Sequence, residues 1–164
     1  MKAVKLIALA DVYALRHYGS TLSSDTYYAM KNGPVASNID NIIEQSDEYL
    51  GDLDRIQYVK EFLEREPGNT WSRVRAGQEA DSDYLSERDT EVLDMIFEKY
   101  YDCSPRHIIE KTHQYQAWKK HESALQEAGS GRVEMEEEDF FENDGDLAAP
   151  KEVLSLSREF YGRV

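Results

Sequence analysis

The stretch from Asp25 to Val35 most constrains how this chain folds, because it places a Gly-Pro step directly after an extended run. Glycine accepts the positive φ of a tight turn, and proline at a first helical position needs no amide partner. We therefore expect a short strand over residues 26–30 and a helix that begins at Pro34. The signature residues supply no nucleophile, no acid-base pair and no metal ligand; they are Tyr27, Ala29, Gly33, Pro34 and Val35.

The chain is strongly acidic. Its 164 residues include 33 acidic and 19 basic side chains, which gives a formal net charge of -14. A surface of this charge repels phosphates, so we expect no direct contact with nucleic acid and favour basic protein partners. The single cysteine, Cys103, excludes an intrachain disulfide and fits a reducing cytoplasm.

An apolar segment runs from Lys5 to Leu15 near the N-terminus. Its apolar residues cover nearly every side of a helix, which is typical of a helix at the centre of a core. The segment is too short to span a bilayer, so we expect no membrane contact. Asp11 interrupts it, and because a buried carboxylate is costly unless paired, we expect Arg16 or a tyrosine hydroxyl to satisfy it.

Apolar residues at helical spacing predict most of the remaining elements. We expect helices over residues 34–50, 53–63, 86–100, 105–113, 114–125 and 150–164. Ser86 and Asp89 form the capping box of the third of these, whose buried stripe includes Phe97. A strand over 70–76 is expected to pair with 26–30. The predicted fold is α+β, mainly α, with about six helices around the N-terminal one and a small antiparallel sheet of two or three strands.

Composition changes after Gly131. Residues 134–146 contain eight acidic side chains and no basic one, around the apolar residues Met135, Phe140 and Phe141. These three either bind a partner or dock on the protein's own core while the acids face water. We therefore divide the chain into a helical domain over 1–129 and an acidic segment with a C-terminal helix over 130–164.

Trp71, Arg73 and Arg75 form a local concentration of aromatic and cationic character. On an exposed strand edge these residues would bind a segment or an acidic patch of a partner protein. Alternatively, Trp71 packs inward and both arginines pair with the protein's own carboxylates. Tyr28, on the first predicted strand, is a further candidate for partner contact.

The possible catalytic features are weak. Glu110 and His113 have a spacing that places two ligands on one helical face, but a di-metal site needs this motif twice. Ser86 lacks the Gly-x-Ser-x-Gly elbow that exposes a nucleophile. We expect no catalytic residue, no metal and no cofactor; a metal-dependent enzyme that uses Glu110, His113 and His121 is the rival interpretation.

Five motifs follow one another along the chain: Leu9-Ala-Asp11, His17-Tyr18-Gly19, Tyr27-x-Ala29-x-x-x-Gly33-Pro34-Val35, Leu85-Ser86 and Thr112-His113-x-x-x-x-Trp118. In this order they resemble the Panacea domain, the SocA-like antitoxin family, over about residues 3 to 125. The resemblance implies a structural role for the motif residues. It also implies an antitoxin that binds a toxin protein directly, either occluding it or delivering it to a protease.

The resemblance carries further expectations about partners. We expect the toxin to be encoded by an adjacent bacterial or phage gene, and a homodimer of this chain remains open. Family members usually have residues before the first helix, so a toxin-specific N-terminal extension is expected to be missing and the acidic segment becomes the first candidate for partner choice. Deleting residues 134–164 should then abolish neutralisation and leave 1–129 folded.

A nucleic-acid mimic is the alternative function. Ordered carboxylates would imitate phosphates and occupy the basic groove of a DNA-binding protein. This alternative predicts acids that are fixed on helices, and binding that weakens steeply with salt.

Overall fold

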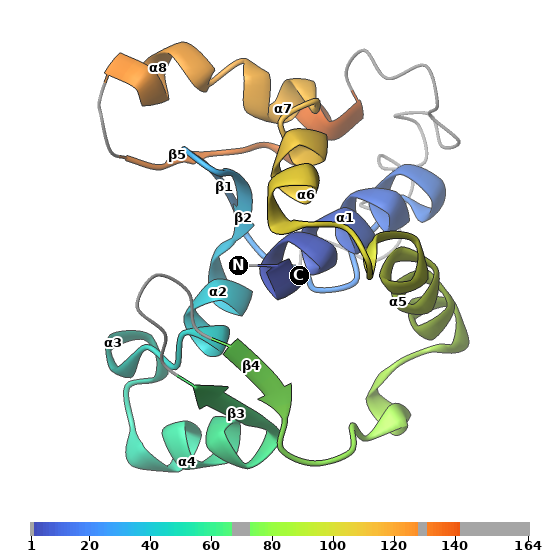
Figure 1. Ribbon diagram of the computed structural model, residues 1–164, viewed down its shortest axis with the longest axis vertical. Coiled ribbons are helices and arrows are strands. Elements are labelled where there is room, and N and C mark those ends of the chain that lie inside the picture. The colour runs from blue at the N-terminus through green and yellow to red at the C-terminus, as the bar shows by residue number, and fades with distance from the viewer. Residues whose placement is uncertain (1, 67–72, 128–130, 142–164) are drawn as a thin grey trace.

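The computed structural model describes residues 2–66, 73–127 and 131–141. The described residues form eight α-helices, two 3₁₀ helices and two small antiparallel sheets, which confirms the predicted α+β, mainly α class (Figure 1). The predicted C-terminal helix over 150–164 lies outside the described residues, as does Trp71.

Helix α1 (Lys2–Tyr18) is the central element, as its apolar sequence predicted. It packs against helix α5 (Glu87–Tyr100), helix α6 (Pro105–Thr112) and strand β2 (Gly33–Ala36). Gly19 directly follows the helix; it has a φ of 78°, and its amide donates to the carbonyl oxygen of Leu15 at 2.9 Å. These elements are thus arranged around one buried helix.

The main sheet has three antiparallel strands, β1 (Tyr27–Met30), β2 (Gly33–Ala36) and β5 (Val133–Glu134), in the order β2-β1-β5. The expected helix start at Pro34 is wrong, because Pro34 lies in β2 opposite Ala29. An edge strand tolerates proline, since the missing amide costs no bond on the unpaired side. Helix formation begins three residues later.

Three short helices follow, α2 (Ser37–Ile43), α3 (Asp47–Leu50) and α4 (Leu53–Phe62). The predicted single helix over 34–50 is broken, because Gln45 has a φ of 52° and Ser46 starts α3 as its N-cap. Helix α2 has no cap of its own. Instead, the Asp25 carboxylate accepts from the amides of Asn38 and Ile39 at 2.9 and 2.8 Å, which satisfies the first turn.

Strands β3 (Leu63–Glu66) and β4 (Arg73–Ala76) pair with each other in a second sheet. The expected pairing of 70–76 with 26–30 is therefore wrong, because β1 already has β2 and β5 as neighbours. The hairpin is attached to α2 by an ion pair between Arg65 and Glu44. Figure 1 shows α3, α4, β3 and β4 together at the lower end of the molecule, away from α1.

Helix α5 (Glu87–Tyr100) follows a 3₁₀ turn, η1 (Ser82–Tyr84). The predicted capping box is confirmed: the Ser86 hydroxyl accepts from the Asp89 amide, and the Asp89 carboxylate accepts from the Ser86 amide. Val92 and Ile96 are buried as expected, but Phe97 is 52% exposed. The predicted buried stripe is thus narrower than its apolar sequence.

The remaining described elements are α6 (Pro105–Thr112), α7 (Gln116–Lys119), α8 (Glu122–Glu127) and the 3₁₀ helix η2 (Glu137–Phe141). Ser104 caps α6 through a bond from the His107 amide, and Pro105 occupies its first turn. The helix predicted over 114–125 is divided into α7 and α8. Together with the division of 34–50, this gives eight α-helices in the described residues where six were expected, the N-terminal helix included in both counts.

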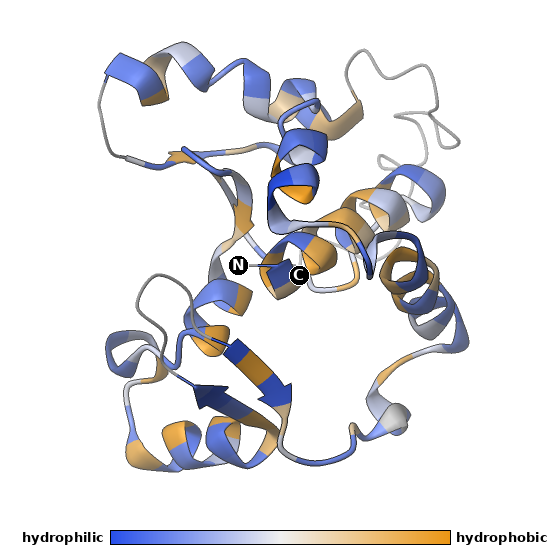
Figure 2. Cartoon of the chain, viewed as in Figure 1, coloured by the Kyte–Doolittle hydropathy of each residue, from blue (hydrophilic) through white to orange (hydrophobic). Residues whose placement is uncertain are grey.

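Two hydrophobic clusters form on either side of α1. One joins α1 to the main sheet, α7, α8 and η2, and the other joins α1 to α5 and α6. Helix α4 contributes to neither cluster and has no buried residue, although Figure 2 shows hydrophobic residues along it. The two clusters therefore position most of the family motifs but not the α4 region.

Candidate functional site

Asp11 is fully buried in α1 and accepts four hydrogen bonds. The amides of Leu22 and Ser23 donate to Oδ1 at 2.8 and 3.0 Å, the Tyr27 hydroxyl donates to Oδ2 at 2.6 Å, and the Ser23 hydroxyl also donates to Oδ2. The predicted tyrosine partner is thus Tyr27. Burial is the main cause that raises the pKa of Tyr27. These contacts tie α1 to the loop before β1.

The Gly-Pro step contacts α1 and the end of α6 at one point. Gly33 has a φ of 96°, and Lys5 Nζ donates to the carbonyl oxygen of Pro34. Burial lowers the pKa of Lys5 to about 7, while the nearby Asp40 carboxylate acts in the opposite direction. Thr112 is completely buried beside Gly33. The motif positions at 33, 34 and 112 therefore pack together.

His113 and Trp118 form a second junction between α6, α7 and β1. Their rings stack with centroids 3.7 Å apart, and Trp118 Nε1 donates to the carbonyl oxygen of Met30 at 2.8 Å. Burial, followed by the charge of Lys5, lowers the pKa of His113. The stack forms part of a pocket of about 400 Å³ that is lined by Lys31, His113, Trp118, Glu122, Leu125 and Gln126.

The remaining motif residues lie elsewhere around α1. Tyr18 and Gly19 are at its C-terminal end, where the Arg88 guanidinium lies 5.1 Å from the Tyr18 ring centroid. Leu85, 41% exposed, and Ser86 precede α5. Ala29 is buried in β1, and Val35 is half-buried in β2. The motif residues are therefore distributed over the structural junctions of the fold and do not form one open site.

The residues of the metal-enzyme interpretation do not assemble. Glu110 is exposed and accepts from Arg106 Nε at 3.0 Å, while His113 stacks on Trp118. The pKa of His121 is lowered, mainly by burial. Among residues 2–66, 73–127 and 131–141, no three His, Cys, Asp or Glu side chains are placed to hold a metal ion.

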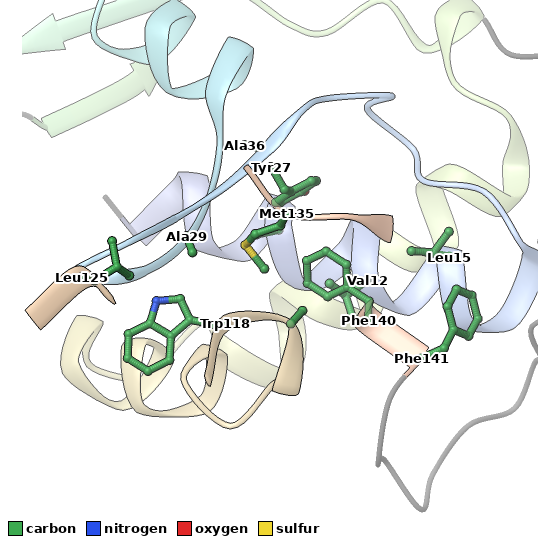
Figure 3. Packing of buried hydrophobic residues seen from close by; sticks show 12 residues of the cluster. Val12, Leu15, Tyr27, Ala29, Ala36, Trp118, Leu125, Met135, Phe140 and Phe141 are labelled. Carbon is green, nitrogen blue, oxygen red and sulfur yellow. The ribbon is translucent and has the colours of Figure 1, made fainter. Parts of the chain in front are cut away.

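Residues 133–141 complete the core. Met135, Phe140 and Phe141 are 6%, 2% and 3% exposed and pack among α1, β1 and α7 (Figure 3). The Phe140 ring meets the Tyr27 ring edge-on, with centroids 5.6 Å apart. Of the two interpretations of these apolar residues, the structure has the one in which they dock on the protein's own core. Their contact with a partner stays a prediction, and it requires this segment to leave the core.

Polar contacts fix the same segment. The Met135 amide donates to the carbonyl oxygen of Tyr27 at 2.9 Å and extends the β1–β5 ladder. Arg16 Nε donates to the carbonyl oxygen of Phe140 at 2.8 Å, and Lys120 forms an ion pair with Asp139. The backbone that carries these acids is therefore held in place by hydrogen bonds, and one of the acids, Asp139, is paired with a lysine.

The other predicted contact residues are at the surface. Arg73 is exposed, and Arg75 is paired with Glu66, as the alternative to partner binding expected. Tyr28 is half-buried, and its ring lies 4.7 Å from the Arg132 guanidinium. The structure places Tyr28 and the two arginines on different sheets.

The structure exposes apolar side chains that the sequence analysis did not name as candidates for partner contact. On α4, Leu53 and Tyr58 are 81% and 62% exposed; on α5, Phe97 and Tyr101 at its end are 52% and 58% exposed. The sequence does not show that Phe97 is exposed, because Phe97 is apolar like the buried Ile96 that it follows. The acidic residues of α5, by contrast, could have been predicted to share one face, because their helical spacing is visible in the sequence.

No helix of the described ranges is both long and apolar enough to cross a bilayer. A search of curated proteins and a search of solved structures found no match. A family model, described as "Antitoxin SocA-like, Panacea domain", matches residues 4–119. This match contains all five motifs and more than half of the chain, and it confirms the resemblance. The chain belongs to the antitoxin SocA-like, Panacea domain family.

Proposed function

We propose that this protein is an antitoxin that neutralises one toxin protein by binding it directly. The family match over residues 4–119 is the observation that carries the proposal, since it supports a general antitoxin role. The toxin is encoded beside this chain, in a bacterial or phage genome, and the complex forms in the cytoplasm. Neutralisation proceeds through occlusion of the toxin or through its delivery to a protease.

The use of the motif residues supports binding without catalysis. Asp11, Thr112 and Trp118 are spent on internal hydrogen bonds and packing. A polar group that is buried and already hydrogen-bonded inside the protein is not available to bind a substrate. The exposed surface is therefore where the partner binds, and Tyr28, Arg73 and Arg75 are the predicted contact residues that the structure leaves accessible.

The first test is co-expression of this chain with the product of the adjacent gene. The neighbour alone should prevent colony growth, the pair should restore it, and the two proteins should co-purify. A harmless neighbour that forms no complex contradicts the proposal. Toxin levels during rescue separate the two mechanisms, because occlusion leaves the toxin abundant while delivery to a protease removes it.

The nucleic-acid mimic remains the second candidate, because one observation favours it. Glu87, Glu91, Asp94 and Glu98 are all exposed on α5, so four carboxylates are fixed on one helix, as that alternative predicted. A mimic should bind a DNA-binding protein with an affinity that falls steeply between about 50 and 200 mM salt, and excess duplex DNA should compete. If excess duplex DNA does not reduce the binding, the nucleic-acid mimic is excluded.

A further inference from the structure

Helix α5 has two faces of opposite character. Val92 and Ile96 are 3% and 6% exposed and fix the helix to α1 and α6 through the second hydrophobic cluster. At about 100° per residue, four acids fall in a sector of about 60° on the opposite side. This acid stripe consists of Glu87, Glu91, Asp94 and Glu98. Because α5 is capped and buried on one side, the stripe is held in place.

An aromatic pair borders the acid stripe. Phe97 and Tyr101 are both more than half exposed, and their rings contact each other with centroids 5.0 Å apart. Lys2 Nζ lies 5.6 Å from the Tyr101 ring centroid and donates to the Tyr101 carbonyl oxygen, which holds the end of the helix. Aromatic side chains with few rotatable bonds are the usual anchors of protein interfaces. The pair and the stripe together are the outer face of α5.

The charges of this face are not used internally. The α5 cations are engaged elsewhere: Arg88 pairs with Asp89, and Lys99 lies 5.5 Å from the Tyr100 ring centroid. No ion pair of the described residues involves a member of the acid stripe. The stripe therefore presents a line of negative charge about 16 Å long, since α-helices rise about 1.5 Å per residue.

We propose that the outer face of α5 binds a basic segment of the toxin, with an apolar side chain on Phe97 and Tyr101 and Lys or Arg side chains along the acid stripe. This inference rests on the proposed antitoxin function. Charge complementarity selects the occupant, because fixed carboxylates attract cations and raise the association rate. A second copy of this chain would bring two acid stripes together, and nucleic acid would bring phosphates to them, so both are repelled.

The experiment compares α5 variants of the full chain with matched variants on α4. Phe97→Ala removes the anchor, and Glu91→Lys with Asp94→Lys neutralises the acid stripe, because two lysines then balance the two remaining acids. The matched controls are Tyr58→Ala, at a tyrosine that is 62% exposed, and Asp54→Lys with Glu61→Lys, which changes the net charge equally at two exposed acids of α4. Circular dichroism checks that each variant is folded.

Binding of the co-expressed neighbour is measured by surface plasmon resonance. Phe97→Ala should weaken it about tenfold or more, as expected when an interface anchor is truncated. The neutralised stripe should slow association about tenfold and flatten its salt dependence, while the α4 controls bind normally. If the α4 variants lose binding and the α5 variants keep it, the proposal is overturned although the antitoxin function stands.

A synthetic peptide tests the face without the toxin. The probe is a 14-residue helical peptide with Leu on one face and Lys on the other, and its counterpart has Glu in place of Lys. Fluorescence anisotropy should show that the Lys peptide binds and the Glu peptide does not. Both α5 variants should bind the Lys peptide more weakly, and both α4 controls should bind it normally. Equal binding to α5 and α4 variants would mean general charge attraction and would overturn the proposal, even if the neighbouring gene product proves harmless.

Discussion

Gly33 in β2 lies directly against Thr112 at the end of α6: a Cβ on Gly33 would be 2.7 Å from Thr112 Oγ1. Lys5 Nζ would be 3.2 Å from the same position. Two motifs that are about eighty residues apart in sequence therefore meet at a site that admits only a hydrogen atom. Several consequences of such contacts can be measured.

Gly33→Ala should destabilise the fold by about 2 to 4 kcal/mol, because it combines overpacking with strain at positive φ. Gly51→Ala is the matched control, since Gly51 has a φ of 75° and nothing within 4 Å of an added Cβ. It should cost only the strain, about 1 to 2 kcal/mol. Urea unfolding followed by circular dichroism gives both values, and equal costs would show that the contact with Thr112 is unimportant.

Asp11→Asn should lower the free energy of unfolding by about 3 kcal/mol or more. The new amide NH₂ group replaces a carboxylate oxygen that accepts hydrogen bonds, so buried donors are left unpaired. Tyr27→Phe removes only one donor to Asp11 and should cost about 1.5 to 3 kcal/mol. Thermal unfolding ranks the two variants. The bonding scheme around Asp11 is refuted if Tyr27→Phe proves the more damaging change.

Phe140→Ala should destabilise the protein by about 3 to 5 kcal/mol, as expected for truncating a buried phenylalanine. Phe97→Ala should change stability by less than about 1 kcal/mol, since that ring is half exposed. The same reasoning alters the expected result of the deletion of residues 134–164. A chain that ends at residue 133 lacks Met135, Phe140 and Phe141, so it should lose cooperative unfolding as well as neutralisation.

The measurement for this segment is chemical denaturation of Phe140→Ala, Phe97→Ala and the shortened chain under the same conditions. Normal, cooperative unfolding of the shortened chain would mean that residues 133–141 add little to the core. In that case the deletion again becomes a clean test of partner choice.

Lys5 should make stability depend on pH. Its pKa of about 7 in the folded protein is below the ordinary value of 10.5, so between these values the unfolded chain binds the extra proton. Stability from this group therefore rises with pH from about 7 to 10.5, by about 1.4 kcal/mol per pH unit, and stays low below pH 7.

Lys5→Met removes this contribution. The charge of Lys5 also lowers the pKa values of Asp40 and His113, but the pH range compared lies above the ordinary values of both groups, 3.8 and 6.5. The stability of the original chain minus that of Lys5→Met should increase between pH 7.5 and 9.5, as measured by urea unfolding at fixed ionic strength. Parallel curves for the two proteins would contradict a depressed pKa of Lys5.

Some elements were predictable because their causes are local. The capping box of Ser86 and Asp89 and the Ser104-Pro105 start depend on residues within one turn, and both occur as predicted. The family motifs were likewise visible in sequence order, and the family match confirms them.

Other predictions failed where a distant neighbour decides. Pro34 suits a helix start and an edge strand equally, and pairing with Ala29 selects the strand. The strand predicted over 70–76 was expected to pair with 26–30, yet residues 73–76 pair with 63–66 as a hairpin. Phe97 and Ile96 are adjacent apolar residues of α5, but only Ile96 is buried, because only Ile96 faces α1 and α6.

The sequence alone determined the central helix, the caps of α5 and α6, the acidic composition and the family, because short-range spacing and composition carry that information. Only the tertiary structure decided that Phe140 is inside, that Phe97 is outside, and which strands pair. Burial depends on which surfaces meet after the chain has folded back on itself. The surface left for a partner is what those contacts do not cover, so sequence spacing supplies its charges while packing determines its exposed aromatic residues.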